Sequence, residues 1–357
     1  MNADTQRRWL RWIPAAAVPA VVAVGLLASG ATAGSPPPPA TPEQVLALAA
    51  AHTARQFSGT MEQSSDLGLP SIPGQALGAA KGSTSFGSEA ALLELLTSAH
   101  TAKVYADGPA RERVQVLDQL AERDAVRNGS DLWTYDSAAH AVTHAVLPAS
   151  AGATAPGASA VSPDQLAQRL LAAAGPSTDV SLAQPATVAG HSAYTLVLTP
   201  KAAGTLVASV RIAVEAQTGL PLAVDVYAKG QDAAAFHAAF TQLTLAAPDA
   251  SVFAFTPPAG AKVTQQQLPS AAGQHRQTTG QHAPAAGTSQ GWDSIAVIPA
   301  DKVPAGLKDQ PLMKQLAVPA KGGRVISTSL FTVLLADDGR VLAGAVPAAA
   351  LEAAAAR

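Results

Sequence analysis

Alternating apolar and polar positions mark Val188–Pro257 as a run of β-strands. Within Thr205–Ala216 an apolar side chain falls on every second position, and the positions between them include Arg211 and Glu215. Period two is the geometry of a strand because successive side chains leave opposite faces of the pleat. Gln217-Thr218-Gly219 then predicts a turn into a second alternating run. The pattern indicates an antiparallel hairpin with one apolar face and one solvated face.

The apolar positions of these strands are candidates for facing a ligand, because an antiparallel sheet must cover its apolar face with something. Most are small aliphatics, which leave room that aromatic side chains would fill. An apolar segment after the first strand, interrupted by glycine and proline, is a candidate lid. An ordinary packed core would show the same alternation, so both interpretations stay open. The candidate set is Leu67, Leu69, Ile72, Tyr194, Leu196, Leu198, Val210, Ile212, Val214, Leu222, Val224, Val226, Phe236 and Phe240.

Other elements follow from capping and turn signals. Thr41-Pro42 predicts the start of a helix that reaches about Gln56. Asn128-Gly129 is a strong hairpin signal within the meander His100–Pro148. A second helix is expected over Ser162–Ala174, and the phase of the alternation reverses near Leu243, which indicates a bulge. Further strands are expected over 57–64, 294–298 and 324–346, with helices over 89–96 and 347–357.

The N-terminus has the features of a secretory signal peptide. Arg7, Arg8 and Arg11 precede the apolar run Ile13–Ala28, and the small-residue site Ala31-Thr32-Ala33 follows. The alternative is an uncleaved membrane anchor. Either way the body lies beyond the cytoplasmic membrane, in the cell envelope. The expected division is 1–33 leader or anchor, 34–41 proline-rich spacer, 42–263 main domain, 264–290 flexible linker, and 291–357 a small strand-rich extension with a terminal helix.

Composition narrows the function classes. Hydrophobic residues make up 48% of the chain but aromatic residues only 4%, so the apolar content is mostly alanine, valine and leucine. Charged residues are 13%, the net charge is −2, and the mature part has no basic block, which argues against a nucleic-acid partner. The absence of cysteine excludes disulfides, thiolate metal sites and a cysteine nucleophile.

Candidate catalytic groups have simpler interpretations. His140 and His144 are four apart and would share a strand face, but no third metal ligand accompanies them. The acidic residues of Asp118–Asp124 could do acid–base chemistry. Because Arg123 and Arg127 are close by, surface ion pairs are favoured instead. The chain has no glycine-rich phosphate loop and no nucleophile elbow. The sequence therefore predicts a protein that is not an enzyme and needs no cofactor.

Five stretches resemble the LolA-like group of lipoprotein and lipid carriers, which includes the MucB/RseB-like sigma factor regulatory proteins. Together they span roughly Pro42 to Val263, and the block after Gln290 lies outside the shared part. The match is one of pattern and order. The stretches are Ser65–Pro70, Val114–Ser137, Gly190–Lys201, Val210–Gly230 and Phe255–Val263.

The resemblance implies a mainly β, α+β fold, in which a curved antiparallel sheet forms an incomplete barrel and helices cover its concave face. In the family that space holds acyl chains. The implied partner is an acylated lipid or lipoprotein, held for carriage or sensing. The alternative is an RseB-like regulatory module that binds a membrane-bound anti-sigma factor or another envelope protein.

Overall fold

The computed structural model describes residues 36–52, 54–69, 99–117, 121–147, 177–267, 291–303 and 311–357. The leader, Ile72 and the helices expected over 89–96 and 162–174 lie outside the described residues. Within the described ranges, no helix is both long enough and apolar enough to cross a membrane.

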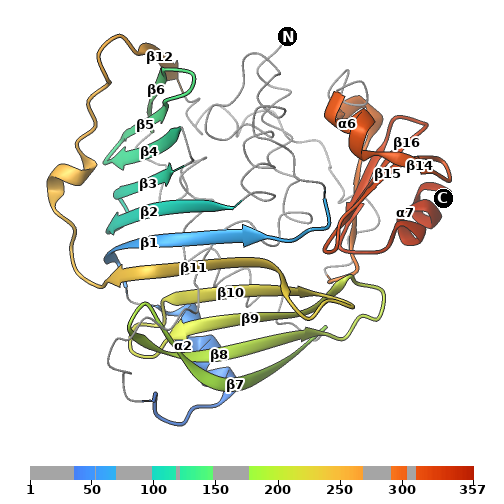
Figure 1. Ribbon diagram of the computed structural model, residues 1–357, viewed down its shortest axis with the longest axis horizontal. Helices are drawn as coiled ribbons and strands as arrows, with labels where there is room; N and C mark the ends of the chain where they lie inside the picture. The colour runs from blue at the N-terminus through green and yellow to red at the C-terminus, as the bar shows by residue number, and fades with distance from the viewer. Residues whose placement is uncertain are drawn as a thin grey trace, which may run out of the picture.

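A curved sheet of twelve strands is the larger of the two sheets that the structure describes, and it stays open, since its first and last strands do not pair (Figure 1). Its order is β12-β6-β5-β4-β3-β2-β1-β11-β10-β9-β8-β7, and all pairs are antiparallel except β12 with β6. This is the mainly β, incomplete barrel expected from the sequence. The strands are β1 (Gln56–Ser65), β2 (His100–Asp107), β3 (Arg111–Leu117), β4 (Glu122–Asn128), β5 (Asp131–Asp136), β6 (Ala141–Val146), β7 (Thr178–Val188), β8 (His191–Pro200), β9 (Val207–Glu215), β10 (Pro221–Ala228), β11 (Ala234–Thr244) and β12 (Lys262–Gln267).

Local signals explain several of these boundaries. Helix α2 (Pro42–Ala50) begins with a capping box between Thr41 and Gln44, as the threonine–proline pair predicts. The expected bulge is present where β11 pairs with β1, because Thr60 pairs with Gln242 and Met61 with Phe240.

Other expectations need correction. Helix α2 ends at Ala50, six residues before the expected limit, because the chain must extend to enter β1. The β4–β5 turn lies one residue later than expected: Asn128 pairs with Asp131, and Gly129-Ser130 forms the loop with a φ of +65° at the glycine. Strand β7 was not expected, since proline interrupts its alternation at the edge of the sheet. Strand β12 extends over 264–267, the first residues of the expected linker.

The two faces of the large sheet are covered differently. We call the face that carries Tyr194 and packs against α2 the inner face, and the opposite one the outer face. The Tyr194 hydroxyl donates to the carbonyl oxygen of Pro38 at 2.9 Å, which holds the segment before α2 over the inner face. On the outer face the connection from β11 to β12 crosses β3 and β4 through the 3₁₀ turn η2 (Ala250–Phe253), with Phe253 buried.

Residues after Gly291 form a second, separate sheet, at the right of Figure 1. Its order is β13-β17-β16-β15-β14, all antiparallel, and α7 (Ala348–Ala355) packs on β16 and β17. The strands and terminal helix expected here are therefore present. The remaining bounds are β13 (Ile295–Ile298), η4 (Ala300–Lys302), α6 (Pro311–Leu316), β14 (Val318–Ala320), β15 (Gly323–Ser327), β16 (Thr332–Ala336) and β17 (Val341–Gly344).

Specific bonds fix this second sheet to one end of the large one. The Trp292 indole donates to the Thr178 hydroxyl at 2.8 Å, and the Thr205 hydroxyl donates to the carbonyl oxygen of Ala345 at 2.9 Å. Trp292 and Leu330 are buried in the same apolar cluster as the inner face of the large sheet. The segments before β13 and between β15 and β16 thus contribute side chains to the large core.

Candidate ligand-binding face

The inner face of β8–β11 is a continuous apolar surface set by strand register. Leu196 pairs with Ile212, which pairs with Val224, and Val224 pairs with Ala238. The next row repeats this through Leu198, Val210, Val226 and Phe236. Residues directly opposite in antiparallel strands share a face, so these rows form one surface.

The structure brings most of the candidate residues together on this surface. Those on β8–β11 all belong to one buried cluster. Leu222 lies at a register shift between Pro221 and Ala223 and is still fully buried. Leu67 is buried in the same cluster, and its carbonyl oxygen accepts from the Ser329 amide at 3.0 Å. Leu69 is half-buried and packs against the apolar clusters of both sheets. Ile72 is outside the described residues.

The apolar inner face is wider than the sequence indicated. It continues across β1, β2 and β3 through Phe57, Val104, Val114 and Val116, which join the same cluster. Period-two alternation in those strands could have identified the valines. Trp292, which precedes β13, follows no periodic pattern, so no local signal could have placed it there.

Helix α2 packs tightly on one part of this face. It contacts β7 and β8, with Val45 and Ala49 buried. Gly219, in the β9–β10 turn, has a φ of +76°, and a Cβ added there would collide with the carbonyl oxygen of Leu48. Glycine is therefore required both by the turn and by the close approach of α2.

Beyond the valines, the inner face of β3–β5 carries charge. Glu112 lies directly opposite Arg127, and Arg123 lies directly opposite Asp136. Both arginines and Asp136 are buried. Desolvation raises the pKa of Glu112 to about 7, although the positive charge of Arg127 opposes the shift. The inner face is thus aliphatic at one end and charged at the other.

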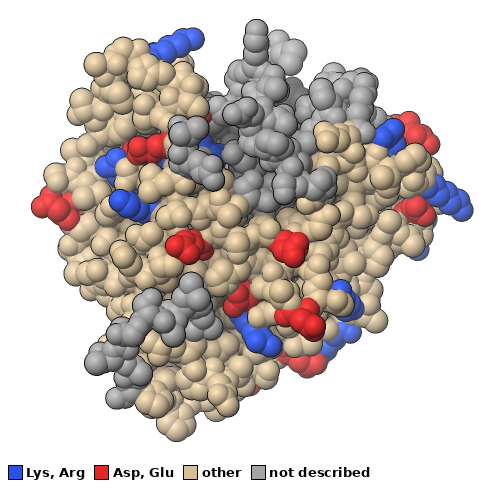
Figure 2. Space-filling model, viewed as in Figure 1, with Lys and Arg blue, Asp and Glu red and all other residues tan. Residues whose placement is uncertain are grey.

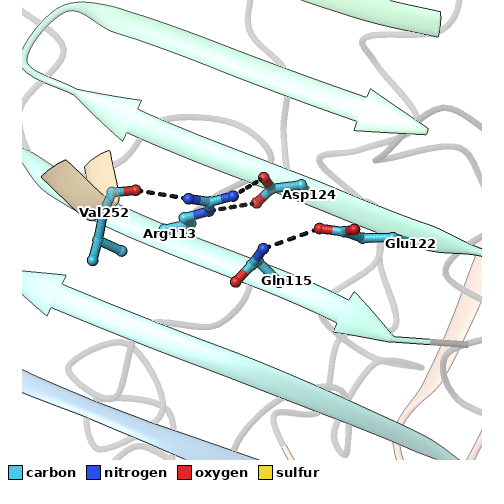
Figure 3. A network of polar contacts seen from close by, with 5 residues as sticks. All are labelled: Arg113, Gln115, Glu122, Asp124 and Val252. Carbon is cyan, nitrogen blue, oxygen red and sulfur yellow. Dashed lines mark hydrogen bonds and ion pairs between the residues drawn. The ribbon is translucent and has the colours of Figure 1, made fainter. Parts of the chain in front are cut away.

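Of the carboxylates considered for acid–base chemistry, Glu122 and Asp124 lie on the outer face, in a bonded network (Figure 3), and Asp118 lies outside the described residues. Arg113 Nε and Nη2 donate to the two oxygens of Asp124 at 3.1 and 2.7 Å, and Nη1 donates to the carbonyl oxygen of Val252 at 2.9 Å. Gln115 Nε2 donates to Glu122 at 3.0 Å.

This network corrects the expectation that these carboxylates form surface ion pairs with Arg123 and Arg127. The Asp124 side chain is only 2% exposed, its partner is Arg113, and the two expected arginines lie on the other face of β4. Burial raises the Asp124 pKa, while its bonds to Arg113 lower it. The network anchors η2 to β3 and β4.

The two histidines considered as metal ligands have different partners and do not point to one common site. His140 has a φ of 48° in the turn before β6, and its Nε2 is 3.3 Å from the carbonyl oxygen of Ala259. His144 is stacked on Trp133 and is hydrogen-bonded to Asp131 and Gln265. Among the described residues, no three potential ligands cluster in a way that could hold a metal ion. On the face shown in Figure 2, acidic and basic side chains are interspersed.

Comparisons with known proteins give fold neighbours only. No family model matches the sequence, and no curated protein matches it. The chain is similar to a MucA/MucB complex structure from Pseudomonas aeruginosa, with 20% identity, coverage of 88% of this chain and 95% of that one, and a TM-score of 0.42. It is also similar to a LolA superfamily protein from Nitrosomonas europaea, with 10% identity, coverage of 61% and 99%, and a TM-score of 0.25. An uncharacterized conserved protein from Thermus thermophilus matches with 11% identity, coverage of 63% and 98%, and a TM-score of 0.34.

These structures include the LolA-like and MucB groups that the sequence resembles. Their similarity is too low to carry a function to this chain, so the function is inferred from the chain's own residues.

Proposed function

We propose that this chain is an exported, non-catalytic binding protein that holds an acyl chain of a lipid or lipoprotein against its apolar inner face. The observation that carries the proposal is the width of that face, which stays apolar from β8 to β3. An acyl chain gains about 25 cal/mol for each Å² of apolar surface removed from water. A long, wide aliphatic surface is therefore suited to a ligand without directional groups.

The test is native mass spectrometry on the protein purified from its own envelope without detergent. A discrete extra mass that fragments into acyl chains supports the proposal. A clean protein mass, with no uptake of added monooleoylglycerol, would make the inner face an ordinary packed core. The partner to seek would then be a membrane-bound regulatory protein.

Two variants test whether the lipid binds at the inner face. Val224→Phe adds volume in the middle of the aliphatic rows and should lower the lipid-bound share several-fold. Thr195→Phe places the same ring on the outer face of β8 and should leave lipid content unchanged. Equal lipid content in both folded variants would contradict binding at this surface.

A further inference from the structure

One buried arginine on the inner face lacks acceptors for most of its donors. Arg127 is 8% exposed, and its side chain points from β4 toward the β4–β5 turn. Within the part of the chain that the structure describes, its guanidinium makes one hydrogen bond, from Nε to the carbonyl oxygen of Gly129 at 3.3 Å. The two terminal nitrogens therefore have no acceptor there. The side chain is mostly buried, but its terminal nitrogens are not among the fully buried polar atoms that lack a partner, so a ligand on this face can reach them.

Glu112 is the carboxylate nearest to Arg127 in register, but it does not accept a hydrogen bond from the terminal nitrogens of Arg127. It lies directly opposite Arg127, yet the two form no ion pair within 4 Å among the described residues. Its raised pKa, about 7, leaves it half protonated at neutral pH. Below that pH Arg127 is the charged member of an otherwise neutral pair.

We propose that Arg127 binds the anionic head, a phosphate diester or a similar oxyanion, of the same amphiphile whose acyl chain lies on the aliphatic inner face. This inference rests on the proposed function and adds the class of ligand. The planar guanidinium presents paired donors that match a phosphate, which makes arginine the usual residue for such contacts.

Strand register shows which residues lie between Arg127, which would bind the head group, and the aliphatic surface that would bind the acyl chain. The row through Arg127 and Glu112 continues to Ala106 on β2 and Phe57 on β1, and the Phe57 ring packs edge-on against Phe240 of β11. From β4 to β10 is five strand steps, about 24 Å at roughly 4.8 Å per step. That length suits one long acyl chain lying across the strands.

Other charged or titratable groups on this face are few and belong to named strands. Among the described inner-face positions of β1–β5 they are Arg123 on β4, Asp136 on β5 and His100 on β2. Arg123 and Asp136 oppose each other two rows from Arg127, and His100 lies beyond the Ala102–Val116 row. The residue on β2 opposite Glu112 is Ala106, so Arg127 is the cation directly facing it.

The experiment compares two lipids with the same acyl chain on the whole protein. Oleoyl lysophosphatidylglycerol carries a single negative charge between pH 6 and 8, and monooleoylglycerol carries none. We expect the wild type to prefer the anionic lipid about tenfold at pH 6 and to lose most of this preference by pH 8, since ionised Glu112 then competes for Arg127. Glu112→Gln should keep the preference at both pH values.

Variants and controls keep the test decisive. Arg127→Gln alone would leave Glu112 without its cation, so the double variant Glu112→Gln/Arg127→Gln is used, and it should bind both lipids equally. The matched control is Arg113→Gln/Asp124→Asn on the outer face, which also neutralises a buried pair and should keep the preference.

Three outcomes would overturn the inference. If the wild type binds both lipids equally, the acyl-chain function stands and the head-group site is wrong. If inorganic phosphate binds as tightly as the anionic lipid, Arg127 serves a free anion instead. If neither lipid binds, the proposed function itself fails.

Discussion

Replacing Glu112 with glutamine should stabilise the protein at alkaline pH. The glutamate is largely desolvated on the inner face of β3, and that burial is the main cause of its raised pKa. Glutamine has nearly the shape of the protonated acid but cannot ionise. The variant therefore removes the cost of burying the carboxylate and leaves the packing in place.

The magnitude follows from the pKa in the two states. In the unfolded chain the group has its ordinary pKa of 4.5, and in the folded protein about 7. Below pH 4.5 it is protonated in both states and costs nothing. As pH rises toward 7 the unfolded chain loses the proton first, so the free energy of unfolding falls. Above pH 7 the full penalty is present, about 3 kcal/mol for a shift of roughly 2.5 pKa units.

Urea unfolding followed by tryptophan fluorescence at pH 5, 6, 7 and 8 measures this directly. The gain of Glu112→Gln over wild type should be small at pH 5 and reach about 3 kcal/mol at pH 8. Glu43→Gln is the control of opposite sign: hydrogen bonds at the start of α2 lower the Glu43 pKa, so its loss should destabilise at neutral pH. A Glu112→Gln variant no more stable than wild type at pH 8 would refute a desolvated carboxylate.

Three further changes test contacts that hold the fold. Gly219→Ala should cost at least about 2 kcal/mol in urea unfolding, because the new Cβ meets backbone of α2. Gly190→Ala, with a similar positive φ but open space, should cost only about 1 kcal/mol, and equal losses would contradict the close approach. Arg113→Gln should cost about 2–3 kcal/mol at pH 7 and less in acid, because burial raises the pKa of Asp124 and protonation neutralises it there; a pH-independent loss would contradict this. Thr41→Ala should lower stability by about 1 kcal/mol through loss of the cap, measured against Ser58→Ala.

Regular alternation made the aliphatic half of the sheet predictable. Between Tyr194 and Phe240 each strand keeps one apolar face, so period two alone assigns which residues share a surface. The glycine-containing turns and the bulge near Leu243 could be predicted as well, and they mark where one strand leads into the next. Burial alone does not distinguish a ligand surface from a packed core, and this part of the hypothesis stays a prediction.

The pairing of residues on different strands could not be predicted from the sequence in the same way. Which residue opposes Arg127 depends on the register of β3 with β4, and what covers Asp124 depends on the crossing of η2. Neither follows from local spacing. Alternation along the strand, by contrast, sends Asp124 to the face opposite Arg123 and Arg127, so grouping the three as ion pairs was an avoidable error.

The contrast between the two faces of β4 is the reason for proposing a ligand at Arg127. On the outer face the chain supplies its own partners: Asp124 and the carbonyl oxygen of Val252 accept three hydrogen bonds from Arg113. On the inner face the more deeply buried Arg127 has one long bond, to Gly129. The same strand thus satisfies its charge on one side and leaves donors open on the other. Structural ion pairing accounts for the first arrangement, and the proposed anionic ligand would supply the acceptors that the second lacks.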